Sequence, residues 1–414
     1  MKSVAIKDIV HSVSQTHKFE KDHLKAVNTS DVLGGELFDI PYTETALLKG
    51  QFKKTIIFND ILFSEIRPAN RRFARVKIKE TDDYVVSTKL MVLRKFNDNV
   101  DLSYFYYCLT NQSFLEILQR RAENRIGSFP QITFDLLGEY RFPIPTLDEQ
   151  KRIASVISNI DSKINLNREI NRNLEAMARQ LYDYWFVQFD FPDENGRPYK
   201  SSGGKMVWNE KLKREIPEGW CDGKLIDIAS ITMGQSPDGS SYNEQGEGVL
   251  FYQGSTDFGI RFPSVRQFTT APTRFAKQGD ILMSVRAPVG TTNIANADCC
   301  IGRGLAAINS KRGSITHLLH IIQDLKIAFD MRNDAGTTFG SITKDDLYGL
   351  LVLIPNPTVV SQYEHLCASI FDRQMIIGNE IDSLERQRDE LLPLLMNGQV
   401  SVMPLATNCD LPHD

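Results

Sequence analysis

A run of basic side chains between residues 49 and 79 is the strongest chemical signal in the sequence. It holds nine lysines and arginines against Asp60 and Glu65, a local charge of +7 in a 414-residue chain whose formal net charge is −4. A basic stripe of this kind is the electrostatic footprint expected of a surface that binds the phosphate backbone of nucleic acid. An ordinary solvated face would carry similar charges, so the run by itself leaves both interpretations open.

Single residues in and beyond this run have the chemistry to contact DNA. Arginine and lysine bind phosphates and also fit the paired acceptors of guanine, while amides and hydroxyls in a turn can reach a base edge. A surface salt bridge or an ordinary turn residue is the alternative for each position. The candidate DNA contacts are Lys53, Lys54, Arg67, Arg71, Arg72, Arg75, Gln235, Ser236, Arg286 and Arg303.

Motifs that would make the chain an enzyme are not found in the sequence. No glycine-rich cofactor loop follows a predicted strand, no phosphate loop is complete, and residues 356–358 fall short of the Asn-Pro-Pro-Tyr type of tetrapeptide that holds a flipped adenine. The six cysteines show no C-x-x-C spacing, so free thiols are expected in place of a metal site. The sequence therefore predicts a binding protein with no catalytic residues, no metal and no cofactor of its own.

Composition sets the class of protein. A hydrophobic fraction of 42% and a charged fraction of 24% are those of a globular protein, and the length suggests two or three domains. No stretch approaches 18 apolar residues, and the first residues have no apolar run that could act as a signal peptide. A cytoplasmic location is expected.

Two long, charge-rich segments are predicted to hold these surfaces in place. Residues 146–187 and 357–400 each carry an apolar stripe that steps by three and four residues, which is typical of a coiled-coil seam. Neither stripe can remain exposed, so the two helices are predicted to bury each other. The residues expected to pair the helices are Ile153, Ile157, Ile160, Ile164, Leu174 and Leu181 in the first, and Ile370, Ile377, Ile381, Leu384 and Leu391 in the second.

The predicted seam contains polar residues. Asn167 and Asn171 occupy seam positions in the first helix, as do Gln374 and Arg388 in the second. Buried polar residues at such positions weaken a coiled coil but fix its register and orientation. In the alternative, the stripe drifts at a period of 3.6 residues, so that Leu166 and neighbouring apolar residues replace the asparagines in the interface and the amides are solvated.

The remaining sequence divides into two mixed blocks, a connector and a tail. In the first block, residues 1–145, the apolar runs 55–58, 61–63 and 89–93 are predicted strands, and residues 102–118 have a helical pattern. The connector is rich in proline, glycine and charge and is expected to have little core of its own. The other boundaries are 188–219 for the connector, 220–356 for the second block and 401–414 for the tail.

The second block repeats the framework of the first. Residues 60–68 match residues 280–288 at an offset of 220, and Ile132-Thr133 match Ile342-Thr343 at an offset of 210. The fold class is therefore α+β, with two mixed α/β domains joined by two long helices that form an antiparallel coiled coil with pseudo-two-fold symmetry. Two similar blocks held apart by a helical spacer suit a bipartite target such as duplex DNA.

Several motifs in this framework resemble those of one protein family. Residues 144–150 resemble the family's start of the first helix, a proline followed by Glu-Gln, from which the second copy departs with Ser361-Gln362. The resemblance covers both repeats. The remaining motifs are ARQLYDYWFV at 178–187, PYKSSGGKM at 198–206, EIPEGW at 215–220 and LLPLLMNG at 391–398. With these motifs, the chain resembles the specificity subunits of type I restriction-modification systems.

The resemblance implies that both blocks are target-recognition domains, each reading one half of a bipartite DNA site. It also implies two modification (methyltransferase) subunits and the restriction subunits as partners, with S-adenosylmethionine, ATP and Mg²⁺ bound by those partners. The complex would then be an N6-adenine DNA methyltransferase and ATP-dependent endonuclease. A two-domain scaffold that does not bind DNA and a stand-alone DNA methyltransferase are the alternatives.

Overall fold

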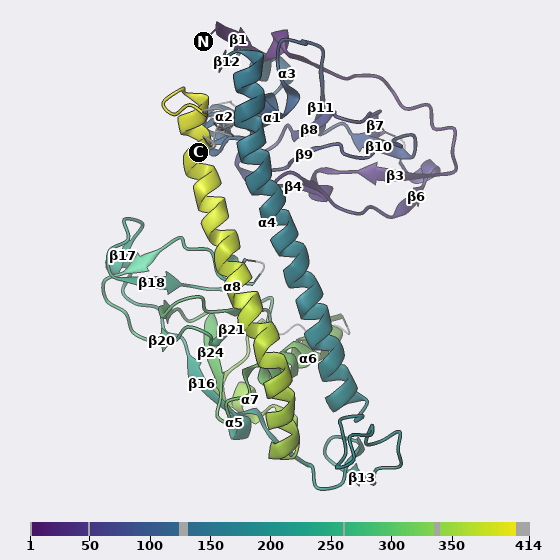
Figure 1. The fold of residues 1–414 in the computed structure, drawn as a ribbon, viewed down its shortest axis with the longest axis vertical. Helices are drawn as coiled ribbons and strands as arrows, with labels where there is room; N and C mark the ends of the chain where they lie inside the picture. The colour runs from purple at the N-terminus through teal and green to yellow at the C-terminus, as the bar shows by residue number, and fades with distance from the viewer. Residues whose placement is uncertain (1, 49, 124–130, 260, 335–339, 403–414) are drawn as a thin grey trace, which may run out of the picture. The chain divides into compact units, whose positions relative to one another are not determined.

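The computed structural model describes residues 2–48, 50–123, 131–259, 261–334 and 340–402 (Figure 1). The chain forms two compact units. Unit 1 comprises Met1–Ile164 and Ser383–Asp414, and unit 2 comprises Asn165–Asp382. Each unit therefore contains one mixed α/β domain and part of each long helix.

Two long helices, α4 (Leu147–Tyr182) and α8 (Pro357–Met396), follow the two domains in the sequence. They are the blue-teal and yellow helices of Figure 1, and α4 continues into a π-helical turn, Asp183–Val187. In unit 2, Asn167 Nδ2 donates to Glu380 Oε2 at 2.9 Å and the Tyr363 hydroxyl donates to Ala178 O at 3.4 Å. Partner numbers fall along α8 as they rise along α4, so the helices are antiparallel.

The apolar residues predicted to pair the helices are all at least half-buried. Four of them lie in the interior: Ile153, Ile157, Ile164 and Ile377. The remaining seven are partly covered: Ile160, Leu174, Leu181, Ile370, Ile381, Leu384 and Leu391. Burial of this stripe within each unit supplies the hydrophobic stabilisation that a long helix needs in water.

The polar residues of the seam are buried as well. Asn167 and Asn171 are only 6% and 8% exposed, whereas Leu166 is 57% exposed, so the alternative in which the asparagines are solvated is wrong. In unit 2, Gln374 Nε2 donates to the carbonyl of Asn171 at 3.5 Å. In unit 1, Arg388 Nη1 lies 3.1 Å from Asp161 Oδ1. Cross-helix hydrogen bonds thus compensate for part of the cost of burying these groups.

In unit 1, two four-stranded sheets and three short helices form the domain. The first sheet supports the core, in which Phe63, Tyr104 and Phe105 pack with Ile157 of α4 and Leu395 of α8. Its strand order is β2 (Val10–Ser12), β11 (Leu90–Lys95), β8 (Ile61–Ser64) and β9 (Phe73–Arg75). The second sheet has the order β6 (Tyr42–Glu44), β3 (His23–Val27), β10 (Tyr84–Ser87) and β7 (Phe52–Lys54). The other elements are the pair β1 (Lys2–Ala5) and β12 (Arg141–Ile144), the hairpin β4 (Val32–Leu33) and β5 (Glu36–Leu37), and helices α1 (Leu102–Thr110), α2 (Gln112–Glu123) and α3 (Phe134–Gly138).

The domain of unit 2 is built on the same plan. Its core combines Ile281, Met283 and Leu318 with Tyr363 and Cys367 of α8. One sheet has the order β16 (Ala229–Met233), β24 (Leu305–Ser310), β21 (Ile281–Ser284) and β22 (Thr292–Ile294). The other has the order β17 (Tyr242–Asn243), β19 (Phe268–Thr269), β18 (Val249–Tyr252), β23 (Cys299–Ile301) and β20 (Phe275–Ala276). The other elements are the pair β15 (Cys221–Lys224) and β25 (Leu351–Ile354), and helices α5 (Leu225–Ile228), α6 (Ile315–Asp334) and α7 (Lys344–Gly349).

Equivalent hydrogen bonds confirm the predicted repeat. Asp60 Oδ2 accepts from the backbone N–H three residues earlier at 2.8 Å, and Asp280 Oδ2 does the same at 2.8 Å. Ser64 Oγ donates to the carbonyl two residues later at 3.0 Å, as Ser284 Oγ does at 2.7 Å. The short motif shared by residues 60–68 and 280–288 therefore encodes one local structure, a capped strand and the turn that follows it.

Two expectations from the sequence need correction. Residues 55–58 are not a strand, because the β7 strand ends at Lys54 and the N–H of Ile57 binds the Asp60 carboxylate instead of a neighbouring strand. The connector has more structure than expected, since Phe189 and Phe191 are buried in the core of unit 2. It also forms the hairpin β13 (Met206–Asn209) and β14 (Arg214–Pro217). Its aromatic residues, spaced among polar ones, supply the apolar surface that a solvated linker lacks.

The starts of the two long helices are anchored differently. In unit 1 the buried side chain of Gln150 donates from Nε2 to Asn99 O at 3.1 Å and to Pro145 O at 3.0 Å, and its Oε1 accepts from the Asp101 N–H at 2.7 Å. In unit 2 the carboxylate of Glu364 instead receives the Thr316 hydroxyl at 2.7 Å, at the N-terminus of α6. Each arrangement satisfies N–H groups that a helix start leaves without partners.

Replacing Asp60 by alanine is expected to destabilise unit 1 strongly. Asp60 is buried and receives Nε and Nη2 of Arg94 at 2.9 and 2.8 Å, so its removal leaves a half-buried guanidinium without its carboxylate. We expect a loss of about 3–5 kcal/mol in unit 1. Asp280→Ala is the matched control, because its partner Asn309 is uncharged, and about 1–3 kcal/mol is expected. Hydrogen exchange of β8 and β21 measures both, and equal losses would contradict a role for the Arg94 charge.

Candidate nucleic-acid interface

The turn after β8 presents the basic residues of unit 1 that are best placed for an external partner. Arg67 and Arg71 flank the short helical turn Pro68–Asn70 and both adopt left-handed backbone conformations, with φ of 47° and 55°. Such conformations cost a non-glycine residue roughly 1–3 kcal/mol and are concentrated at functional sites. The Arg67 side chain is exposed, and that of Arg71 is half-buried.

Two other basic candidates, Arg72 and Arg75, are occupied by contacts within unit 1. Arg72 Nη1 donates to Ser30 O at 3.2 Å and Val32 O at 3.3 Å. Arg75 donates from Nη2 to Asn59 Oδ1 at 2.8 Å and from Nη1 to Ser103 Oγ at 2.9 Å. These guanidinium groups hold loops of the domain to β9, so fewer of their donors remain for a phosphate.

Lys54 is also directed inward. Its Nζ donates to Leu90 O at 2.8 Å and to Thr88 O at 3.2 Å, and it lies 3.8 Å from Glu65 Oε1. Burial lowers the pKa of Lys54, and the neighbouring Glu65 carboxylate opposes this shift. Its neighbour Lys53 is exposed, whereas Lys49, counted in the basic run, lies outside the described residues.

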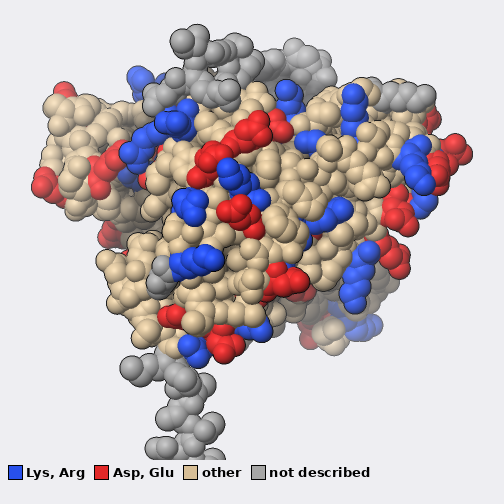
Figure 2. All heavy atoms as spheres, turned by 90° about the horizontal axis from the view of Figure 1, so that it is seen from above, with Lys and Arg blue, Asp and Glu red and all other residues tan. Residues whose placement is uncertain are grey.

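Basic and acidic side chains alternate on the face of the molecule seen in Figure 2. Lysine and arginine are interspersed there with aspartate and glutamate, and no broad region of one sign stands out on the visible face. Because Arg72, Arg75 and Lys54 are bound within unit 1, the sequence-local charge of +7 is a weaker guide to a binding surface than the placement of individual side chains.

In unit 2 the structure brings three of the four candidates together. The Gln235 N–H donates to Ile301 O at 3.0 Å, and the Arg303 N–H donates to Ser236 Oγ at 3.3 Å. Gln235 and Arg303 therefore project from adjacent turns at one end of β16 and β24. The fourth candidate, Arg286, is exposed at a separate turn after β21, where its backbone bridges to Ser341.

The sequence analysis missed exposed polar residues that join these turns. Gln253 follows β18 and Arg274 precedes β20, and both lie beside the Gly302-Arg303-Gly304 turn. In unit 1, Lys89 occupies the turn between β10 and β11 that corresponds to this one. The repeat was the signal in the sequence that could have located these turns. The corresponding strands β11 and β24 begin with Leu90 and Leu305, directly after the two turns.

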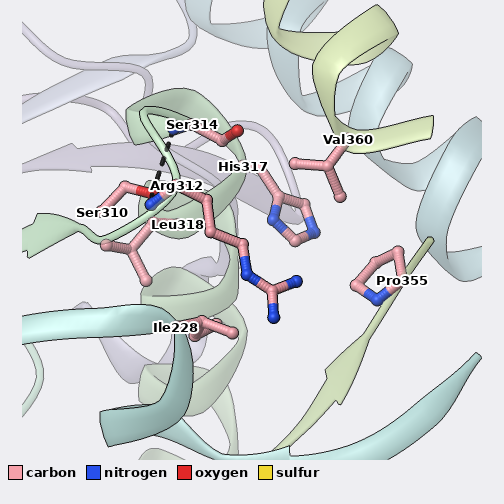
Figure 3. A pocket seen from close by; sticks show the side chains of 8 residues that line it. All are labelled: Ile228, Ser310, Arg312, Ser314, His317, Leu318, Pro355 and Val360. Atoms are coloured by element: carbon pink, nitrogen blue, oxygen red, sulfur yellow. Dashed lines mark hydrogen bonds between the residues drawn. The ribbon is translucent and has the colours of Figure 1, made fainter. Parts of the chain in front are cut away.

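A small cavity in unit 2 lies beside the N-terminus of α6 and does not extend the interface. It holds about 20 Å³, room for roughly one water molecule, and Figure 3 shows Arg312 and His317 directed toward it from the α6 side and Val360 and Pro355 from the other. Val360 stands five residues after Pro355, as Gln150 stands five residues after Pro145 in unit 1. The cavity therefore lies where unit 1 holds the Gln150 amide.

Two histidines of α6 are buried, and one of them, His317, lines this cavity. Burial lowers the pKa of His317 to about 3 and that of His320 to about 4. The ring of His317 lies 4.3 Å from that of Phe186, and the ring of His320 lies 5.0 Å from that of Tyr182. Both imidazoles are uncharged at neutral pH and pack against aromatic rings at the end of α4 and in the π-helical turn that follows it.

Other kinds of site are not found in the part of the chain that the structure describes. Within it, no group of three His, Cys, Asp or Glu side chains could hold a metal ion. Cys108, Cys221, Cys299, Cys300 and Cys367 are free thiols. No helix among the described residues is long and apolar enough to cross a membrane.

Several known proteins are similar to this chain in sequence and in fold. Residues 1–176 match the family model described as "Type I restriction modification DNA specificity domain". A relative from Methanocaldococcus jannaschii, provisionally named the MjaX type I restriction enzyme specificity subunit, is 29% identical over 419 residues, which cover 96% of this chain and 93% of the relative. The HindI specificity subunit of Haemophilus influenzae is 26% identical over 465 residues, which cover 96% of this chain and 99% of that protein.

A solved structure shows that the fold is also shared. The type I restriction-modification system S subunit from M. genitalium superposes with a TM-score of 0.54 at 16% identity, over 95% of this chain and 96% of that one. The family model matches the first domain and most of α4, and the two relatives extend the match across nearly the whole chain. Over nearly its whole length, this chain is similar to type I restriction-modification specificity subunits.

Proposed function

We propose that each domain reads one half of a bipartite DNA site and that the paired helices set the separation of the two halves. The observation that carries this proposal is the repeat: two domains share strand order and local hydrogen bonds but present different side chains at corresponding turns. A conserved framework with divergent surface residues suits two readers of two different short sequences.

The helices also carry features that suit docking of the modification subunits. In unit 2, four large apolar side chains on α4 and α8 are half or more exposed: Leu166, Met177, Leu366 and Ile376. These side chains are the contacts that we propose for the modification subunits, which would cover them. The proposed partners are two modification subunits, which would bind S-adenosylmethionine, and restriction subunits, which would bind ATP and Mg²⁺. We propose that the chain itself has no catalytic activity.

Salt-sensitive binding to DNA tests this function. The chain purified with its modification subunits is expected to bind duplex DNA bearing its site with an affinity that falls about a thousandfold between 50 and 200 mM salt, as for six or more phosphate contacts. A duplex with only one half-site is the control and should bind more weakly at every salt concentration. The site itself is found by sequencing modified adenines in the host genome. Absence of salt-sensitive binding to DNA would favour a scaffold, and methyl transfer by the chain alone would favour a stand-alone methyltransferase.

A further inference from the structure

Four segments of unit 2 converge on one rigid turn cluster. The Gly234 N–H donates to Leu305 O at 2.9 Å, the Gly302 N–H donates to Tyr252 O at 2.8 Å, and the Ile301 N–H donates to Arg274 O at 2.9 Å. These bonds tie the ends of β16, β18 and β20 to the turn between β23 and β24. The backbone of the cluster is thus held at each of its four segments.

Glycines make this convergence possible. A Cβ atom on Gly234 would lie 2.1 Å from Gly302 O, and one on Gly304 would lie 2.6 Å from Gln253 O. No side chain fits at either distance without moving backbone. The sequence therefore uses glycine where these segments touch, and Gln235 and Arg303, which adjoin Gly234 and Gly304, are exposed.

Four polar residues of these segments face outward: Gln235, Gln253, Arg274 and Arg303. All four are exposed, and no hydrogen bond or ion pair joins their side chains to any part of the chain that the structure describes. They differ in this from Arg72 and Arg75 of unit 1, whose guanidinium groups are bound internally. Amide and guanidinium groups are the side chains whose paired donors and acceptors match adenine and guanine edges in the major groove.

We infer that Gln235, Gln253, Arg274 and Arg303 form the base-reading surface of the second domain. This inference rests on the proposed function and adds to it the residues that determine one half-site. A rigid backbone lowers the entropy lost when these side chains bind, and their lack of internal partners leaves every donor and acceptor available to DNA. Gln253 and Arg274 are expected to act together with Arg303, because the backbones of all three meet at one turn.

The test uses the complex of the full chain with its modification subunits and a duplex library in which the second half-site is randomised. Gln253→Ala, Arg274→Ala and Arg303→Ala are each expected to reduce the preference for one base pair by about tenfold or more, as for loss of a bidentate contact. Preference at the first half-site should not change. Arg312→Ala is the matched control, because Arg312 is an exposed arginine beyond the opposite end of the same strand, β24.

The possible outcomes separate this inference from the proposed function. If the parent complex shows no sequence preference, the proposed function fails. If the parent is specific and the three variants keep its preference at every position, the base-reading assignment is overturned while the function stands. Equal weakening on all sequences would assign these residues to phosphate contacts and would likewise overturn it. Hydrogen exchange of β24 checks that each variant is folded.

Discussion

A chain in which residues 220–356 are replaced by the matching domain of a relative is expected to direct methylation to a site with one new half. The other half and the number of base pairs between the halves should stay unchanged, because unit 1 and both long helices are retained. Sequencing of modified adenines in a host that carries the exchanged chain and its modification subunits gives the result directly. A change in both halves would contradict separate reading by the two domains.

The structure indicates what such an exchange must preserve. The guanidinium of Arg261 lies 5.1 Å from the ring centre of Phe371 on α8. The ring of Phe262 lies against Gly378 of α8, where a Cβ atom added to the glycine would be 2.2 Å from that ring. Asn296 Nδ2 donates to Asp382 Oδ2 of α8 at 3.4 Å. A donor domain that lacks these contacts will seat poorly on α8. The control is therefore a second chimera that keeps residues 259–263 and 296 of the parent.

Lowering the pH is expected to destabilise unit 2 at pH values at which surface carboxylates are still ionised. Burial lowers the pKa of His317 to about 3 and of His320 to about 4, whereas an unfolded histidine has a pKa near 6.5. Below pH 6.5 the unfolded state therefore binds more protons, so stability is complete above that pH and falls toward pH 4. The linkage relation gives a loss of about 4 kcal/mol between pH 7 and pH 5 for the two groups together. Urea unfolding at pH 7 and at pH 5, monitored by hydrogen exchange of α6, measures this loss of stability.

Variants at these two positions identify the source of the pH dependence. His317→Phe combined with His320→Gln removes both titrating rings and should flatten the stability of unit 2 between pH 7 and pH 5. His365→Gln removes an exposed histidine of α8 and should leave the slope of the parent. Burial raises the pKa of Glu364, so this carboxyl contributes in the opposite sense at the acidic end. A slope that persists in the double variant would assign the acid sensitivity to other groups.

The parts of the fold that depend on local periodicity were predictable from sequence. Helical seams repeat every three or four residues, so the buried Ile157 and Ile377 could be identified without a structure. The repeat of residues 60–68 at 280–288 was also visible in the sequence, because both copies encode the same capped strand and the turn that follows it.

The candidate site was harder to predict because its geometry depends on distant partners. Arg72 is bound by a carbonyl 42 residues away, Arg75 by a hydroxyl 28 residues away, and Lys54 by a carbonyl 34 residues away. No local pattern reports such contacts, so these residues looked as available as Arg67. Gln253 and Arg274 were missed for the converse reason, since only the folded sheet places them beside Arg303.

The different anchors at the starts of α4 and α8 constrain how genes of this kind can recombine. A crossover that placed the second domain in front of α4 would join Thr316 to a helix with no counterpart of Glu364, and would leave the Gln150 amide without Asn99. A second domain moved in front of α4 must therefore carry the first two turns of its own helix. Natural crossovers that move a domain from one half of the chain to the other should fall inside the long helices, downstream of these anchors.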